Sequence, residues 1–162
     1  MPATSTLALF YDGWEQHNAL LVKAIAPLSP EQFRLKPDPL PNQVWQIAAH
    51  IVTNRVFWFH TVLREGDASL EQFADWEDVP DAPRSVSELV AALNTTADFV
   101  LECIQRWTPA MLDDPFERRR RDGQVVTRTR QWVTWHLLEH DIHHGGEISL
   151  MLGMHGLDGL DL

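Results

Sequence analysis

The chain has 162 residues, of which 44% are hydrophobic and 22% charged, as expected for one soluble globular domain spanning 1–162. The formal net charge of −10 repels phosphate backbones and anionic lipids, so we expect neither nucleic acid nor a membrane as a partner. A single cysteine, Cys103, excludes an intrachain disulfide. Because the first residues lack a basic region followed by a long apolar stretch, we expect a cytoplasmic protein.

Apolar residues at three- and four-residue spacing predict two long helices in the first part of the chain. The first is expected over about residues 4–28. Residues 29–32, Ser-Pro-Glu-Gln, have a capping-box pattern with proline at the first helical position, which predicts a short helical turn. The second long helix is expected over about 42–64, with His50 beside its apolar stripe.

Two further long helices are predicted in the rest of the chain. Ser85 and Glu88 form a capping box that begins a third helix, which ends near residue 107. Residues 108–126 contain proline, an Asp-Gly turn signal and four consecutive arginines, and we interpret them as an exposed connection in which a short hairpin fits. The fourth helix is expected over about 127–152, before an extended tail. The sequence therefore predicts an all-α fold, a bundle of four main helices.

The fourth helix carries histidines at the spacing of a metal site. His136, His140 and His144 are four residues apart, so each neighbouring pair shares a helix face about 6 Å apart along the axis. All three cannot readily bind one ion, because His136 and His144 are about 12 Å apart along the axis and zinc–imidazole bonds are about 2.0–2.1 Å long. A third ligand must come from another helix, and His50 is the natural candidate.

Other histidine patterns have weaker interpretations. Three histidines have no partner at ligand spacing and are interpreted as surface or packing residues: His17, His60 and His155. The segment 140–144, His-Asp-Ile-His-His, is similar to the H-E-x-x-H motif of zinc proteases. However, Asp141 is one methylene shorter than the usual glutamate and the metzincin continuation is missing, so proteolysis is the weaker alternative.

Two segments carry a family pattern: residues 140–148, His-Asp-Ile-His-His-Gly-Gly-Glu-Ile, and Trp45 to His50. The first resembles the H-x-x-H-H-R-G-Q-I segment of the DinB/YfiT-like superfamily, and the second resembles the second-helix segment of that superfamily, which ends in a ligand histidine. The resemblance implies a four-helix bundle, often homodimeric, with a divalent metal held by His50, His140 and His144. It leaves His136 outside the ligand set. Members of the superfamily include mycothiol-dependent maleylpyruvate isomerases and bacillithiol S-transferases.

Three neutral imidazoles leave a divalent ion its full charge and an open coordination position, which is typical of catalytic sites. Such an ion acidifies bound water or thiol, and imidazole ligands suit zinc and nickel. Together with the resemblance, the three-histidine site predicts a divalent-metal-dependent enzyme that acts on a small-molecule substrate. A thiol-dependent S-transferase or isomerase that uses a low-molecular-weight thiol is one such enzyme. The alternative is a non-catalytic metal- or ligand-binding helical bundle.

Further residues carry expectations of their own. Glu147 is the candidate catalytic base or water-holding residue, with a solvated surface glutamate as the alternative. Gly145 and Glu147 replace the arginine and glutamine usual in the resembling segment, which puts any role of those side chains in doubt. The run Arg118–Arg121 is either an anion-binding group or a solvated loop. For a homodimer we expect Tyr11 and Trp58, on the outer faces of the first two helices, to form the interface.

Overall fold

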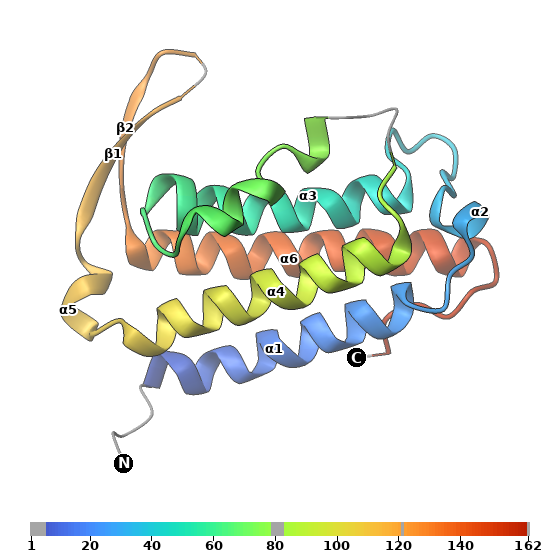
Figure 1. Cartoon of the computed structure of the whole chain (residues 1–162), viewed down its shortest axis with the longest axis horizontal. Coiled ribbons are helices and arrows are strands. Elements are labelled where there is room, and N and C mark those ends of the chain that lie inside the picture. Colours follow the sequence, from blue (N-terminus) through green and yellow to red (C-terminus); the bar gives the residue numbers. More distant parts are fainter. Residues whose placement is uncertain (1–5, 79–82, 121, 162) are drawn as a thin grey trace.

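The computed structural model describes residues 6–78, 83–120 and 122–161. Within these ranges four long helices form a bundle: α1 (Thr6–Ile25), α3 (Val44–Val56), α4 (Val86–Arg106) and α6 (Arg130–Met154). Helix α4 lies between α1 and α3, and α6 contacts both α3 and α1, which closes the bundle (Figure 1). The predicted helical bundle is confirmed, with a two-stranded hairpin added at one end.

The capping signals correctly located two helix starts. The Ser85 hydroxyl accepts a hydrogen bond from the backbone N–H of Glu88, whose carboxylate accepts one from the backbone N–H of Ser85, and α4 begins at the next residue. Ser29 and Gln32 make the same reciprocal pair at the start of α2 (Pro30–Phe33). These side chains satisfy N–H groups that the first turn of a helix leaves without partners.

The predicted second helix is divided, and the chain after it is more ordered than expected. In the described residues between α3 and α4 there are three short helices: η1 (Phe57–Val62), η2 (Ala68–Phe73) and η3 (Trp76–Asp78). The first is a π-helical continuation of α3, and the other two lie in a segment without helical periodicity. Phe73 and Trp76 are buried against α3. Their burial brings η3 next to the part of α3 that carries His50.

The predicted hairpin is present in the connection between α4 and α6. After α5 (Pro109–Leu112), strands β1 (Pro115–Arg119) and β2 (Val125–Thr129) pair antiparallel. The hairpin extends past the edge of the bundle from the first residue of α6 (Figure 1). Because β2 includes residues as far as 129, α6 begins at Arg130 and not near 127.

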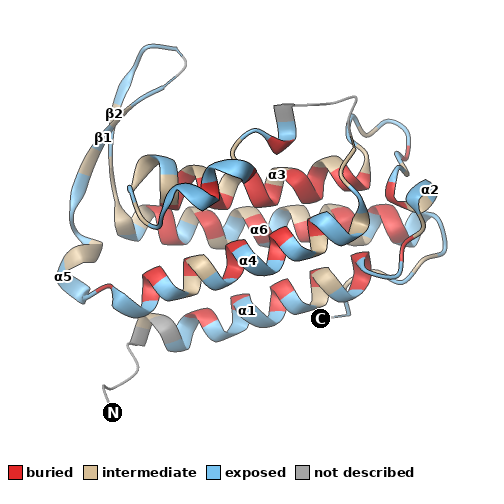
Figure 2. Cartoon of the chain, viewed as in Figure 1, coloured by how far each residue is buried: buried red, intermediate tan, exposed pale blue. Residues whose placement is uncertain are grey.

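Among the described residues, the buried side chains form two apolar clusters between the long helices, and the hairpin is mostly exposed (Figure 2). Tyr11 and Trp58, expected on outer faces at a dimer interface, are only 1% and 4% exposed and belong to the core. That expectation was wrong because each long helix packs against two neighbours, which buries a wider arc than one apolar stripe. None of the described helices has the length and hydropathy required to cross a membrane.

Candidate metal centre

Three histidines from two neighbouring helices form one cluster, here called the histidine cluster: His50 of α3, and His140 and His144 of α6. One ring nitrogen of each lies within 4.8 Å of the others. The Nε2 atoms of His50 and His140 are 2.9 Å apart. The cluster exists because α3 packs along α6, which places His50 opposite the turn between His140 and His144.

Each histidine of the cluster has a carboxylate near its Nδ1 atom. Glu147 Oε2 lies 2.6 Å from His144 Nδ1, and Asp141 Oδ1 lies 3.5 Å from His140 Nδ1. Glu77, from η3, contacts Nδ1 of His50. A carboxylate at Nδ1 holds the ring orientation and favours the tautomer that leaves Nε2 free to bind a metal.

The surroundings of His140 and His144 favour their neutral rings, which are the form that binds a metal. Burial lowers the pKa of His140, although Asp141 acts in the opposite direction. Burial also lowers the pKa of His144, where His140 and His50 add to the effect and Glu147 opposes it. The side chain of His50 is 39% exposed, compared with 10% for His140 and 18% for His144, so the cluster is accessible to solvent from the His50 side.

A buried ion pair lies behind His140. Arg55 and Asp141 are both completely buried, and the Nε and Nη2 atoms of Arg55 each lie 2.8 Å from Oδ2 of Asp141. Trp14 Nε1 donates to the same oxygen at 2.9 Å. Burial alone would raise the pKa of Asp141, but Arg55 and His140 outweigh burial and keep it below its usual value.

The sequence did not reveal this pair, because a charged residue within a helix stripe is normally assigned to solvent. The positions of the two residues in the sequence could have indicated the pair. Arg55 lies among the apolar residues of α3, and Asp141 directly follows a candidate ligand. The bonding of Asp141 to Arg55 and Trp14 also decides against the protease-like motif, because this carboxylate faces the core and not a water-accessible site.

The other histidines lie outside the cluster. His136 stacks on Trp132 with ring centroids 4.7 Å apart, and its Nδ1 is 3.1 Å from Glu139. His143 is exposed and lies 3.5 Å from Glu147. His17 is buried on α1, the Nδ1 atom of His60 contacts the Glu65 carbonyl, and His155 is exposed beyond the end of α6. These three histidines are the packing and surface residues that the sequence predicted.

Comparison with known proteins assigns the family. The model of the DinB superfamily matches residues 14–148, which include the whole histidine cluster. The chain belongs to the DinB superfamily. Its fold is similar to the crystal structure of a DinB-like protein from Bacillus cereus ATCC 10987, with a TM-score of 0.69 and 18% sequence identity over 94% of this chain and 95% of that chain. Among curated proteins, no sequence matches this one.

The structure shows where Gly145 and Glu147 lie, the two residues that differ from the usual DinB segment. Gly145 is buried, and a Cβ atom there would lie 2.6 Å from Nε2 of His17. This position therefore faces α1 and not the histidine cluster, so an arginine here would have no room. The carboxylate of Glu147 contacts Nδ1 of His144 in the cluster.

Proposed function

We propose that this DinB superfamily protein is a divalent-metal-dependent enzyme whose metal ligands are His50, His140 and His144. The observation that supports this most strongly is the convergence of three ring nitrogens within 4.8 Å, with a carboxylate at each opposite ring nitrogen. Two imidazoles on one tetrahedral zinc ion have nitrogens about 3.3 Å apart, close to the 2.9 Å between His50 and His140. The donor set thus fits zinc or nickel.

A divalent ion in this cluster would keep its full charge and an open position, and would acidify a bound thiol or water. The chain's own residues orient the ligands and admit the substrate. Glu77 and Glu147 hold the rings of His50 and His144, and the exposed side of His50 is the route of access. We propose a thiol-dependent transfer or isomerisation of a small molecule as the reaction.

The assignment of ligands is tested by metal content. His50→Ala, His140→Ala and His144→Ala should each lose bound metal, measured by elemental analysis of the purified protein. His136→Ala is the matched control, because His136 is on the same helix but stacks on Trp132. Loss of metal in His136→Ala with retention in His144→Ala would reverse the assignment.

A second function has the same site but no chemistry: a non-catalytic metal- or ligand-binding bundle. The partial exposure of the cluster is compatible with simple ligand binding. The two are separated by turnover of electrophilic substrates with a panel of thiols. A rate above that of His50→Ala supports the enzyme, whereas equal rates in both proteins support the binding bundle.

We also propose that the chain is a homodimer. With Tyr11 and Trp58 in the core, the candidate contact moves to α6, whose exposed apolar side chains are Trp135, Ile142, Leu150 and Met154. Sedimentation equilibrium should give twice the chain mass of 18.6 kDa, and a mass of one chain across the micromolar range would contradict the dimer.

A further inference from the structure

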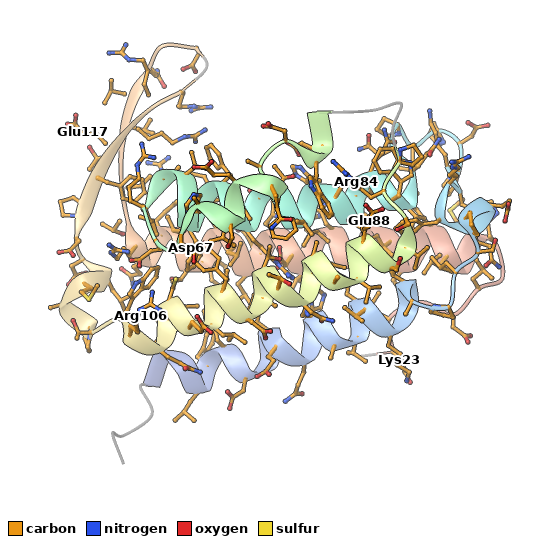
Figure 3. All side chains as sticks on the ribbon, viewed as in Figure 1. Lys23, Asp67, Arg84, Glu88, Arg106 and Glu117 are labelled. Carbon is orange, nitrogen blue, oxygen red and sulfur yellow. The ribbon has the colours of Figure 1, made fainter. Side chains whose placement is uncertain are left out.

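The inner face of the hairpin carries two arginines that have no part in the function proposed above. Burial alternates along β1, where Phe116 and Arg118 are partly buried and Glu117 and Arg119 are exposed. Arg128 of β2 lies opposite Phe116 in the register, so Arg118 and Arg128 share a face. Figure 3 shows Glu117 on the side of the hairpin away from the bundle. The hairpin therefore directs Arg118 and Arg128 toward the helices.

Each of these guanidinium groups lies over an aromatic ring. Cζ of Arg118 is 4.9 Å from the ring centroids of both Phe57 and Trp58. Cζ of Arg128 is 4.8 Å from the ring of Trp132, which in turn contacts Trp58 with centroids 5.1 Å apart. Cation–π contacts of this kind contribute about 0.5–1 kcal/mol at exposed sites, so they hold both arginines in place.

The ring contacts continue along α6 to the histidine cluster. The ring of His136 stacks on that of Trp132. It makes T-shaped contacts with Trp58 and with His140, with ring centroids 5.3 Å and 5.9 Å apart. Positions 132 and 140 are separated by about 12 Å along the helix axis. A molecule that spans from the arginines to the histidines is therefore elongated, with about the length of a tripeptide.

Both guanidinium groups retain donors for a ligand. A cation–π contact forms no hydrogen bond, so it leaves the N–H donors of the guanidinium available to a ligand. Arg128 donates to the Thr127 carbonyl at 3.0 Å. In the part of the chain that the structure describes, neither Arg118 nor Arg128 has a carboxylate within 4.0 Å, whereas the nearby Arg130 is paired with Glu65 at 2.7 Å. In a chain with a net charge of −10, such unpaired arginines favour an anionic ligand.

We propose that Arg118 and Arg128 bind the carboxylate of an elongated ligand whose other end reaches the histidine cluster. This inference rests on the proposed function and specifies its substrate class as a carboxylate-bearing molecule of peptide size. The partly exposed ring of Trp132 contacts the middle of the ligand. The ligand spans the distance between the hairpin and the metal ligands, and this requirement selects against short thiols.

The test compares binding of two probes, glutathione and glutathione diethyl ester, by isothermal titration calorimetry with the zinc-loaded protein. Both probes have the same thiol and nearly the same length, but the ester lacks the carboxylates. The wild-type chain should bind glutathione about tenfold more tightly, as charge-assisted hydrogen bonds predict. The double variant Arg118→Gln/Arg128→Gln should lose this preference.

The matched control is Arg119→Gln/Arg120→Gln, which removes the same charge from the same hairpin. It should keep the preference, because Arg119 is exposed on the other face and Arg120 pairs with Asp122. Equal affinities for both probes in the wild-type chain, or equal losses in the two double variants, would overturn the inference. So would no binding of glutathione at millimolar concentrations.

Metal content separates this inference from the proposed function. If the wild-type chain holds no metal, the proposed function fails, and the probes are replaced by S-methylglutathione and its diethyl ester on the metal-free protein. A carboxylate preference that depends on Arg118 and Arg128 then still supports the anion site, and its absence rejects that site. If metal binds at the histidine cluster but no preference is found, only the inference fails.

Discussion

At the scale of single residues, carboxylates contact the rings of the histidine cluster. Glu147 is the informative position, because its carboxylate contacts Nδ1 of His144 at 2.6 Å. The sequence alone suggested a catalytic base or water-holding residue, with a solvated surface glutamate as the alternative. Orientation of a ligand and proton transfer are separable roles. A glutamine keeps an oxygen that accepts the Nδ1 proton, but it cannot take that proton up.

We predict that Glu147→Ala binds zinc about 10–100-fold more weakly than the wild-type chain, since His144 loses the partner that orients it. Glu147→Gln should stay within a fewfold of wild type. Competition with a coloured chelator measures both affinities. Equal zinc affinity in all three proteins would show that Glu147 does not orient His144, and turnover lost in Glu147→Gln with zinc retained would support a role as base.

The buried ion pair predicts a large effect on stability from a single residue. Replacing Arg55 by methionine leaves Asp141 charged and without its main partner in a site with no solvent exposure. The free energy of unfolding should fall by about 3–5 kcal/mol, as measured by urea denaturation. The exposed pair of Arg120 and Asp122 is the control, and Arg120→Ala should change stability by less than about 1 kcal/mol.

A double variant distinguishes a lost interaction from a stranded charge. Arg55→Met combined with Asp141→Leu removes both charged groups and should recover much of the stability lost in the single variant. If the double variant is as unstable as Arg55→Met, the loss comes from packing around position 55 and not from the uncompensated carboxylate.

At the scale of elements, the packing of α6 against α1 requires a glycine at one of two adjacent positions. A Cβ atom at Gly145 would meet the His17 ring at 2.6 and 2.7 Å, whereas a Cβ atom at Gly146 would meet nothing within 4 Å. The two positions are therefore a matched pair on one helix, one of which faces α1 and the other solvent.

We predict that Gly145→Ala destabilises the protein by about 1–3 kcal/mol, because the buried His17 ring must move. Gly146→Ala should stabilise it by about 0.5–1 kcal/mol, the usual gain when alanine replaces glycine inside a helix. Thermal unfolding of both variants measures the difference. Destabilisation of equal size in both would indicate a general effect on α6 and not a contact with α1.

At the scale of the whole molecule, buried histidines link stability to pH. Burial lowers the pKa of His17, with Asp141 raising it and Arg55 lowering it, and burial also lowers the pKa of His140 and His144. In the unfolded chain these rings titrate near about 6.5. Between the folded and unfolded pKa values the unfolded chain binds more protons, so stability falls as pH decreases below about 6.5 and is unaffected by these groups above it.

We predict that the urea concentration at the unfolding midpoint of the metal-free protein decreases as the pH is lowered from about 7.5 to about 5.5. Each such histidine lowers the free energy of unfolding by up to about 1.4 kcal/mol per pH unit. The slope should be smaller in His17→Gln, which lacks one of the buried titrating groups. A midpoint that does not change with pH, or an unchanged slope in His17→Gln, would contradict the linkage.

The sequence by itself determined the helical bundle, the starts of α2 and α4, and the segments that mark the DinB superfamily. Apolar periodicity, capping pairs and histidine spacing depend on residues within a few positions of one another, so they can be read from the chain directly. The spacing of His140 and His144, with His50 on a second helix, likewise named the side chains that the structure brings together.

Only the tertiary structure decided which partners these residues have. The contact of Glu77 with His50 and the pair of Arg55 with Asp141 join positions 27 and 86 residues apart, and no local pattern encodes such pairs. Tyr11 and Trp58 were assigned to the surface for the same reason, since burial depends on how many neighbours a helix has. The hairpin arginines are directed toward the helices by strand register and by the aromatic rings of other elements, which are known only once the chain is folded.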